Sequence, residues 1–520
     1  MVHCERICNQ LGRHDPAVTA RNRTQLTSNP RSHNPKVAGS NPAPATYEGP
    51  GIPGPFALFE VYVRAVTDAG ATPGEVSDAT IGVIGDGFGA LLVYTTAVYL
   101  GFDPREIAIY GENRNAVGTY QQFAWNLGQT VLRSESESHF LPADWPTFAQ
   151  LDAWSHRHLG PLLRSIRRRY NPGVAEILTE AVTVAHDLGW DDQRVPLRVG
   201  WLQREDGPPA HFVLYDADAG YLGRAKHVML ALGHGPLQFP PPLAAARERD
   251  PTMRERIVQA YEPKVYDGSG RYLVIGTGIA SVNEWANALD AGAKVIALRR
   301  NPQPDEQDLN VPRCLFESQG VDAFQELSLD ERINFLGRTL RGTAPSRRSW
   351  RERVQRGRQE GRFDELLGEI DAVRPGPAGL RVHIKSDHGP DPGWLDVTGV
   401  VCGTGFVKSV LALPVIRRLI DTYGLPVEGA RIPLAPNCGV PGLDRPDSRL
   451  AAMGLLANNV IPHGDTIAGL KYVGRRFVAD CARAERLRER PFFGRLGMQL
   501  SLAGRSADAI RRVRMTEQLA

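Results

Sequence analysis

The pattern of apolar and polar positions becomes regular only after Asp78. A short apolar strand over Ile81 to Ile84 is followed by a glycine turn and then by a helix of small and apolar residues. A second strand, Ile107 to Tyr110, comes next. Strands that alternate with helices in this way form parallel sheets, so the segment predicts a βαβ unit.

A second unit of the same kind lies further along the chain. A strand over Tyr272 to Ile275 leads into a turn at Gly276, a helix that runs through Leu289, and a strand over Lys294 to Leu298. Two such units predict an α/β fold that contains two Rossmann-like dinucleotide-binding domains.

Other stretches fit this plan less directly. The run Leu395 to Phe406 predicts one buried strand that ends in a glycine turn. Residues 1–52 have no hydrophobic periodicity and are predicted to be disordered. Because residues 32–46 resemble the conceptual translation of a transfer-RNA gene, a mis-called start is the favoured explanation of this leader. The apolar run Ile81 to Phe102 is long enough for a membrane span, but its glycines favour a strand, a turn and a buried helix.

Composition narrows the function. At 520 residues the chain is long enough for two or three domains, and 42% hydrophobic and 23% charged residues are typical of globular proteins. A net charge of +3 argues against a nucleic-acid or membrane-surface binder and favours small-molecule chemistry. The six cysteines form no CxxC pair and the histidines no HExxH motif, so no metal site or disulfide framework is predicted. Without an export signal, the cytoplasm is the expected compartment.

The first glycine motif is GxGxxA, from Gly85 to Ala90, directly after a predicted strand and at the start of a predicted helix. Gly85 would allow the tight turn, Gly87 would let the backbone approach a pyrophosphate, and Ala90 would let the helix pack close to the strand. Glu112 follows the second strand, where a carboxylate can accept hydrogen bonds from ribose hydroxyls. The motif therefore predicts a dinucleotide site.

The second motif, Gly276 to Ser281, has the same placement, with Gly278 as its second glycine. After its second strand stand Arg299 and Arg300, where an NAD site usually has an acidic residue. Two guanidinium groups favour a 2′-phosphate, so this site is predicted to prefer NADPH over NADH.

Further stretches resemble a known family. Gly118 and Thr119 follow the acidic residue as in its GTW-type turn, and Asp396 to Phe406, with Thr404 and Gly405, is similar to its ATG-type strand. With the two glycine motifs, this arrangement resembles the flavin-containing, Baeyer–Villiger and N-hydroxylating monooxygenases over about residues 79 to 480. The resemblance implies FAD at the first motif, NADPH at the second, and an NADPH domain inserted into a discontinuous FAD domain.

This resemblance also implies a division of the chain and further cofactor-binding residues. Arg133 lies in a segment similar to the LRS-type loop of the N-hydroxylases, near the flavin. The segment His463-Gly464-Asp465 has two interpretations: Asp465 accepts hydrogen bonds from the ribityl chain of FAD, or the His-Gly pair belongs to the substrate side. The implied parts are the leader 1–52, the FAD domain 53–262 and 389–489, the NADPH domain 263–388, and a C-terminal tail 490–520.

Three functions remain open at this point. The favoured hypothesis is an FAD-dependent, NADPH-using monooxygenase of a small organic substrate, with O2 as the second substrate and no nucleic-acid or membrane partner. The alternatives are an NADPH-dependent flavoprotein reductase without oxygenation and a non-catalytic nucleotide sensor. The cofactor would carry the chemistry, so the sequence identifies no catalytic side chain, and it does not predict the oligomeric state.

Overall fold

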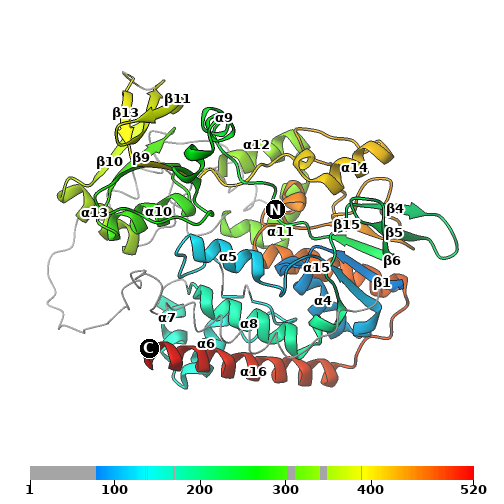
Figure 1. The fold of residues 1–520 in the computed structure, drawn as a ribbon. Coiled ribbons are helices and arrows are strands. Elements are labelled where there is room, and N and C mark those ends of the chain that lie inside the picture. The colour runs from blue at the N-terminus through cyan, green and yellow to red at the C-terminus, as the bar shows by residue number, and fades with distance from the viewer. Residues whose placement is uncertain are drawn as a thin grey trace.

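The computed structural model describes residues 78–519, except residues 135, 138, 168–169, 301–310, 340–347, 388 and 390. The predicted leader 1–52 and the adjoining residues 53–77 lie outside this part of the chain. Within it, two sheets built mainly from parallel strands lie side by side, each covered by helices (Figure 1).

The first half of the molecule is built on a seven-stranded sheet. Its strands follow the order β3-β2-β1-β6-β5-β4, and β15 also pairs with β6. Strand β5 is antiparallel to both of its neighbours, β4 and β6, whereas the other pairings are parallel. The strands are β1 (Asp78–Ile84), β2 (Ile107–Tyr110), β3 (Arg194–Val195), β4 (Trp201–Glu205), β5 (His211–Tyr215), β6 (Tyr221–Leu230) and β15 (Leu450–Ala452).

Helix α4 (Phe88–Leu100) is the centre of this half. Every residue from Ala90 to Val98 is buried, because the helix lies between the sheet and the helices α8 and α15. This explains the apolar run Ile81 to Phe102, and it confirms the predicted strand, turn and buried helix. The other helices of this half are α5 (Gly118–Asn126), α6 (Phe148–His156), α7 (Gly160–Arg167), α8 (Val174–Asp187), α14 (Pro414–Tyr423), α15 (Ile467–Ala484) and α16 (Phe492–Leu519).

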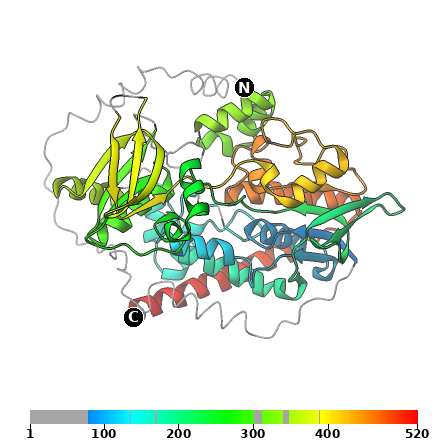
Figure 2. The ribbon, with the colours of Figure 1, turned by 45° about the horizontal axis from the view of Figure 1, so that its top comes forward.

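The second half is built on a five-stranded parallel sheet in the order β10-β9-β8-β14-β7. One face packs against helices α10 and α13, and the other packs against α9 and a three-stranded antiparallel sheet, β11-β12-β13 (Figure 2). The strands are β7 (Ile257–Gln259), β8 (Arg271–Ile275), β9 (Lys294–Arg299), β10 (Phe363–Leu367), β11 (Glu369–Gly376), β12 (Gly379–Lys385), β13 (Gly393–Val397) and β14 (Gly399–Cys402). The helices are α9 (Pro241–Arg249), α10 (Ile279–Asp290) and α13 (Arg348–Gln359).

The fold-class prediction is confirmed: two Rossmann-like units are present, and the chain returns through β15 to the first sheet after it has completed the second. Two details differ from the prediction. The run Leu395 to Phe406 is not one strand, because β13 and β14 belong to different sheets. The five-stranded sheet takes β7 and β14 from outside the predicted range 263–388.

The predicted tail 490–520 contains a long helix, α16, which contacts α6 and α8. A smaller helical segment, α11 (Ser318–Gln325) and α12 (Leu329–Thr339), lies between the halves and contacts the 3-10 helix Gly454–Asn459. Among the helices of residues 78–519, none combines the length and the hydrophobicity that a membrane crossing requires.

Candidate dinucleotide-binding sites

The first glycine turn lies where the carboxyl ends of β1 and β6 meet. Gly85 has a φ of +112°, and a Cβ atom there would overlap the backbone carbonyl of Ala231, so only glycine fits. Gly87 is different, because a Cβ atom there would meet nothing within 4 Å. Gly87 is also the N-cap of α4, and no side chain caps this helix end. The turn thus leaves open space in front of uncapped backbone amides, which suits an anionic diphosphate.

A buried carboxylate, which the sequence reasoning missed, braces this turn. Asp86 is only 7% exposed, and it accepts hydrogen bonds of 2.6 Å from both the backbone nitrogen and Nδ2 of Asn113. Thr119 Oγ1 donates to Asn113 Oδ1 at 3.1 Å. The predicted residues around Gly85, Glu112 and Thr119 are therefore joined through Asp86 and Asn113. In the sequence, the acidic residue between the first two glycines of the motif is the signal that could have identified Asp86 and its partner Asn113.

Glu112 and Gly118 lie on either side of this brace. The carboxylate of Glu112 is largely exposed, with Arg198 Nη1 4.0 Å away, so it remains accessible to a ligand. A Cβ atom on Gly118 would come within 3.2 Å of Asn113 Oδ1, so the small residue lets α5 start close to the loop. Ala90 is fully buried beneath the turn.

The second glycine turn repeats the geometry of the first. Gly276 has a φ of +105°, a Cβ atom on Gly278 would meet nothing within 4 Å, and no side chain caps α10 at Gly278. Ser281 is fully buried and donates to the carbonyl of Ile275 at 3.1 Å. The serine thus holds the turn against the end of its own strand, rather than facing open space.

The two predicted phosphate-binding arginines have acidic partners. Arg299 Nε lies 3.6 Å from Glu365 Oε1, and Arg300 Nη1 lies 3.4 Å from Glu369 Oε1. Arg358 of α13 also pairs with Glu365. Among the described residues, three arginines thus share two glutamates at this edge.

Buried polar atoms gather between β15 and the start of α15. Asn458 and His463 are 1% and 2% exposed, yet Asn458 Nδ2 and Oδ1, and His463 Nδ1, have no hydrogen-bond partner. Asp465 Oδ1 is also shielded and unpartnered. Burial lowers the pKa of His463 to about 4, although a hydrogen bond with the Leu315 backbone opposes the shift. Asn458 begins the segment, residues 458–465, that the sequence places at the flavin, although no role was predicted for its side chain.

The glycine of this segment, Gly464, has no room for a side chain, since a Cβ atom would lie 2.8 Å from Asn458 Oδ1. Arg133 lies in the loop before α6, next to Leu132, whose backbone nitrogen donates to the carbonyl of Pro172.

Thr404 and Gly405 lie at the crossing of the two linkers that join the halves. Gln238 N donates to Gly405 O at 2.9 Å, which pairs the two linkers. The fully buried Gln259 sends its Nε2 atom to Gln238 O, Thr404 Oγ1 and Gly405 O at 3.0–3.2 Å. These two predicted residues therefore belong to the junction between the halves, not to a glycine turn.

A buried ion pair lies at a second contact between the halves. Lys264 Nζ is 3.1 Å from Glu284 Oε1 of α10, and it also donates to Asn126 O, at the end of α5. Asn287 of α10 donates to Leu127 O at 3.0 Å. Helix α5 thus begins at the brace of the first glycine turn and ends against the helix that follows the second.

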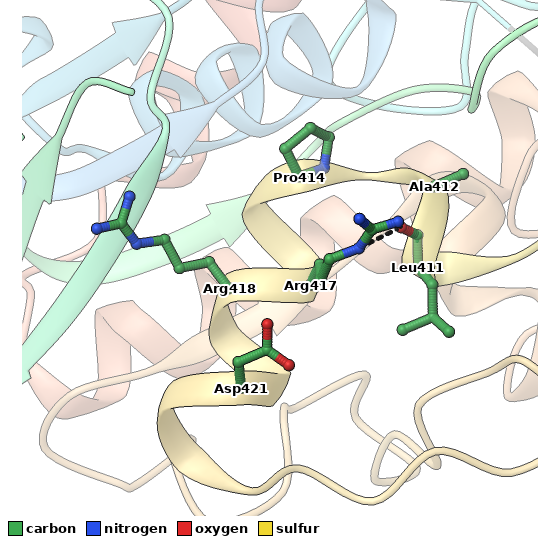
Figure 3. A pocket seen from close by; sticks show the side chains of 6 residues that line it. All are labelled: Leu411, Ala412, Pro414, Arg417, Arg418 and Asp421. Atoms are coloured by element: carbon green, nitrogen blue, oxygen red, sulfur yellow. Dashed lines mark hydrogen bonds between the residues drawn. The ribbon is translucent and has the colours of Figure 1, made fainter. Parts of the chain in front are cut away.

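A surface cavity of about 590 Å³ lies elsewhere, beside α14 (Figure 3). Arg417 donates to Leu411 O there, and Arg418 stacks over the Trp201 ring. The lining contains none of the predicted site residues; it consists of Leu411, Ala412, Pro414, Arg417, Arg418 and Asp421. No group of three or more potential metal ligands occurs among the described residues.

No protein-family model matches the sequence, and no curated protein matches it significantly. Solved structures do match the fold. The reduced form of ornithine hydroxylase from Pseudomonas aeruginosa is 12% identical, with a TM-score of 0.59, and the match covers 79% of this chain and all of that one. Ornithine N-hydroxylase from Kutzneria sp. 744, with reduced FAD, NADP+ and L-ornithine, is 14% identical, with a TM-score of 0.60. That match covers 79% of this chain and 100% of that one.

L-lysine 6-monooxygenase from Pseudomonas syringae is also similar, at 14% identity and a TM-score of 0.59, over 78% of this chain and 99% of that one. The chain therefore has the fold of these structures over essentially their whole length.

Proposed function

We propose that the protein is an FAD-dependent oxidoreductase that takes hydride from NADPH and oxygenates a small organic substrate. The observation that carries the proposal is the pair of glycine turns. Each lies at the carboxyl edge of a mainly parallel sheet, with an uncapped helix end and open space at its second glycine, Gly87 or Gly278. One such turn is common, whereas two in one chain suit a pair of dinucleotides.

The first turn fits FAD. The amides after Gly87 would hold the pyrophosphate, and the exposed Glu112 carboxylate would accept hydrogen bonds from the adenosine ribose. Asp465 Oδ1 and Asn458, buried and unpartnered, offer polar atoms that a ribityl chain or flavin edge would satisfy. The small Gly118 and the hydroxyl of Thr119 would keep the neighbouring loop in place.

The second turn fits NADPH. Gly276 and Gly278 would admit the pyrophosphate, and Ser281 would hold the turn. Arg299 ends β9 and Arg300 follows it, and guanidinium groups at this position favour a 2′-phosphate over a bare ribose.

When bound, the flavin would supply the redox chemistry by accepting hydride and delivering electrons to O2. The chain's own residues bind, orient and shield. The linker crossing at Gln259 and the Lys264 ion pair set how the nicotinamide half faces the flavin half. The similar structures of ornithine and lysine hydroxylases favour a small amine as the substrate class.

An absorbance experiment tests this proposal. Purified protein should be yellow or take up added FAD, and NADPH should bleach it under anaerobic conditions. After air is admitted, amine-dependent oxygen uptake with formation of a hydroxylated amine supports a monooxygenase. Reoxidation without any substrate-linked product indicates a reductase, and a flavin that NADPH never bleaches indicates a sensor. Protein that takes up no FAD would overturn the proposal.

A further inference from the structure

The surface around α7 carries large exposed apolar side chains. Leu159, Leu163 and Ile166 are 68%, 59% and 80% exposed. A hydrogen bond from Leu163 N to Leu159 O continues the helical backbone towards the N-terminus of α7. The three residues are spaced i, i+4, i+7, so their side chains lie on one face of the helix. This exposed apolar stripe has no covering element among the described residues.

Arginines surround this stripe. Arg157 and Arg164 are exposed, Arg167 ends the helix, and the sequence has no acidic residue from position 153 to 175. The acids that flank this stretch, Asp152 and Glu176, are both paired with Arg514 of α16, and Asp152 Oδ2 also lies 3.9 Å from Arg164 Nη2. The small net charge of the whole chain, +3, therefore does not reveal the basic surface around α7. We use the name α7 patch for six residues: Arg157, Leu159, Leu163, Arg164, Ile166 and Arg167.

Trp154 extends the α7 patch onto α6. It is 47% exposed, and its ring edge lies beside Gly504 of α16. The patch therefore lies at one end of the molecule, beside the C-terminal end of α16 (Figure 1). Tryptophan and arginine around an apolar helix face are typical of helices that lie in the headgroup region of a bilayer.

We propose that the α7 patch docks the protein on an anionic lipid surface, with the apolar stripe in the headgroup region and the arginines on lipid phosphates. Charge complementarity selects this partner. In a symmetric dimer the same patch would face its copy, and the arginines would meet arginines. An anionic bilayer instead has an apolar acyl-chain region for the leucine and isoleucine side chains and negatively charged headgroups for the arginines. The inference is independent of the proposed enzymatic function.

The test measures binding of the full-length protein to vesicles by co-sedimentation. Vesicles of phosphatidylcholine with added phosphatidylglycerol should bind the protein, whereas phosphatidylcholine alone should bind it at least tenfold more weakly. Raising the salt concentration should release the protein, because exposed charges are screened. This comparison needs no variant, so it is unaffected by any folding defect.

Variants then locate the surface. R164Q with R167Q should weaken binding by about fivefold per arginine, and L163S with I166S should weaken it at least tenfold. The matched controls L197S and R488Q alter exposed residues elsewhere and should bind as the unaltered protein does. Equal binding to both vesicle types, or binding that none of these α7 variants changes, overturns the proposal. So does a dimer that L163S with I166S dissociates, which would make a second copy the occupant.

Discussion

At the scale of single residues, the glycine turns separate residues needed for folding from residues needed for binding. Gly87 and Gly278 have φ values of −91° and −72°, which any residue can adopt, and space in front of them. We therefore expect G87V and G278V to fold but to block a pyrophosphate. G87V should lose FAD, whereas G278V should stay yellow yet resist reduction by NADPH, with at least a hundredfold weaker binding. Flavin absorbance and stopped-flow reduction measure these outcomes.

The control for this pair is G85A, at a φ of +112° where a side chain overlaps the Ala231 carbonyl. It should lower the melting temperature of the chain whether or not FAD is added. If G87V bound FAD as tightly as the unaltered protein, the first turn would not be a diphosphate site.

His463 makes stability depend on pH. Its pKa is about 4 in the folded protein, below the ordinary value of 6.5, because the ring is buried. As the pH falls from 6.5 towards 4, the unfolded chain takes up a proton that the folded chain does not, so stability falls by about 3 kcal/mol in total. We expect H463N to remove this part of the acid sensitivity, as measured by urea unfolding between these pH values. The exposed His186, replaced by Gln, serves as the control.

Residues with a motif were easier to predict than residues that only support one. The geometry of Gly85 and Gly276 follows from strand, turn and helix spacing in the sequence. The acidic partners of Arg299 and Arg300 could not be predicted, because Glu365 and Glu369 come more than 60 residues later in the sequence. They come close to the arginines because β10 pairs with β9 and β11 begins just after β10. Asn458 and Gln259 have roles that depend on which segments fold around them.

At the scale of elements, local periodicity predicted the strands β1, β2, β8 and β9 and the helices α4 and α10. It did not predict the break between β13 and β14, because Thr398 alone separates these strands and the break shows only in their different partners. The connecting role of α5 was also not predictable. Its start follows from Gly118, but its end packs against a helix some 150 residues further along the chain.

The end of α5 gives an element-scale prediction. Lys264 is 7% exposed and Glu284 is fully buried, so removing one charge leaves the other buried without its ionic partner. We expect K264M to destabilise the protein by about 3–5 kcal/mol, and K264M with E284Q to recover a large part of that loss. Both should also slow flavin reduction by NADPH more than they weaken NADP+ binding, because the contact orients the halves. Urea unfolding and stopped-flow reduction provide the two measurements.

At the scale of the whole molecule, one linker carries the chain from the first sheet to the second, and another carries it back. Where these linkers cross, Gln259 Nε2 donates to Gln238 O, Thr404 Oγ1 and Gly405 O. One buried amide thus supports both connections. The sequence predicted the insertion of one domain in the other, but not this crossing, since it depends on how two distant segments meet.

Replacing this amide tests whether the crossing unites the halves. Q259L keeps the size of the side chain but leaves Gln238 O, Thr404 Oγ1 and Gly405 O without its hydrogen bonds, at a cost of about 1–3 kcal/mol. We expect Q259L to split thermal unfolding into two transitions and to increase the radius of gyration in small-angle scattering. The exposed side chain of Gln238 takes no described part in the crossing, so Q238A should unfold in one transition. A single, unshifted transition for Q259L would mean that the contact of α5 with α10 holds the halves together without the linkers.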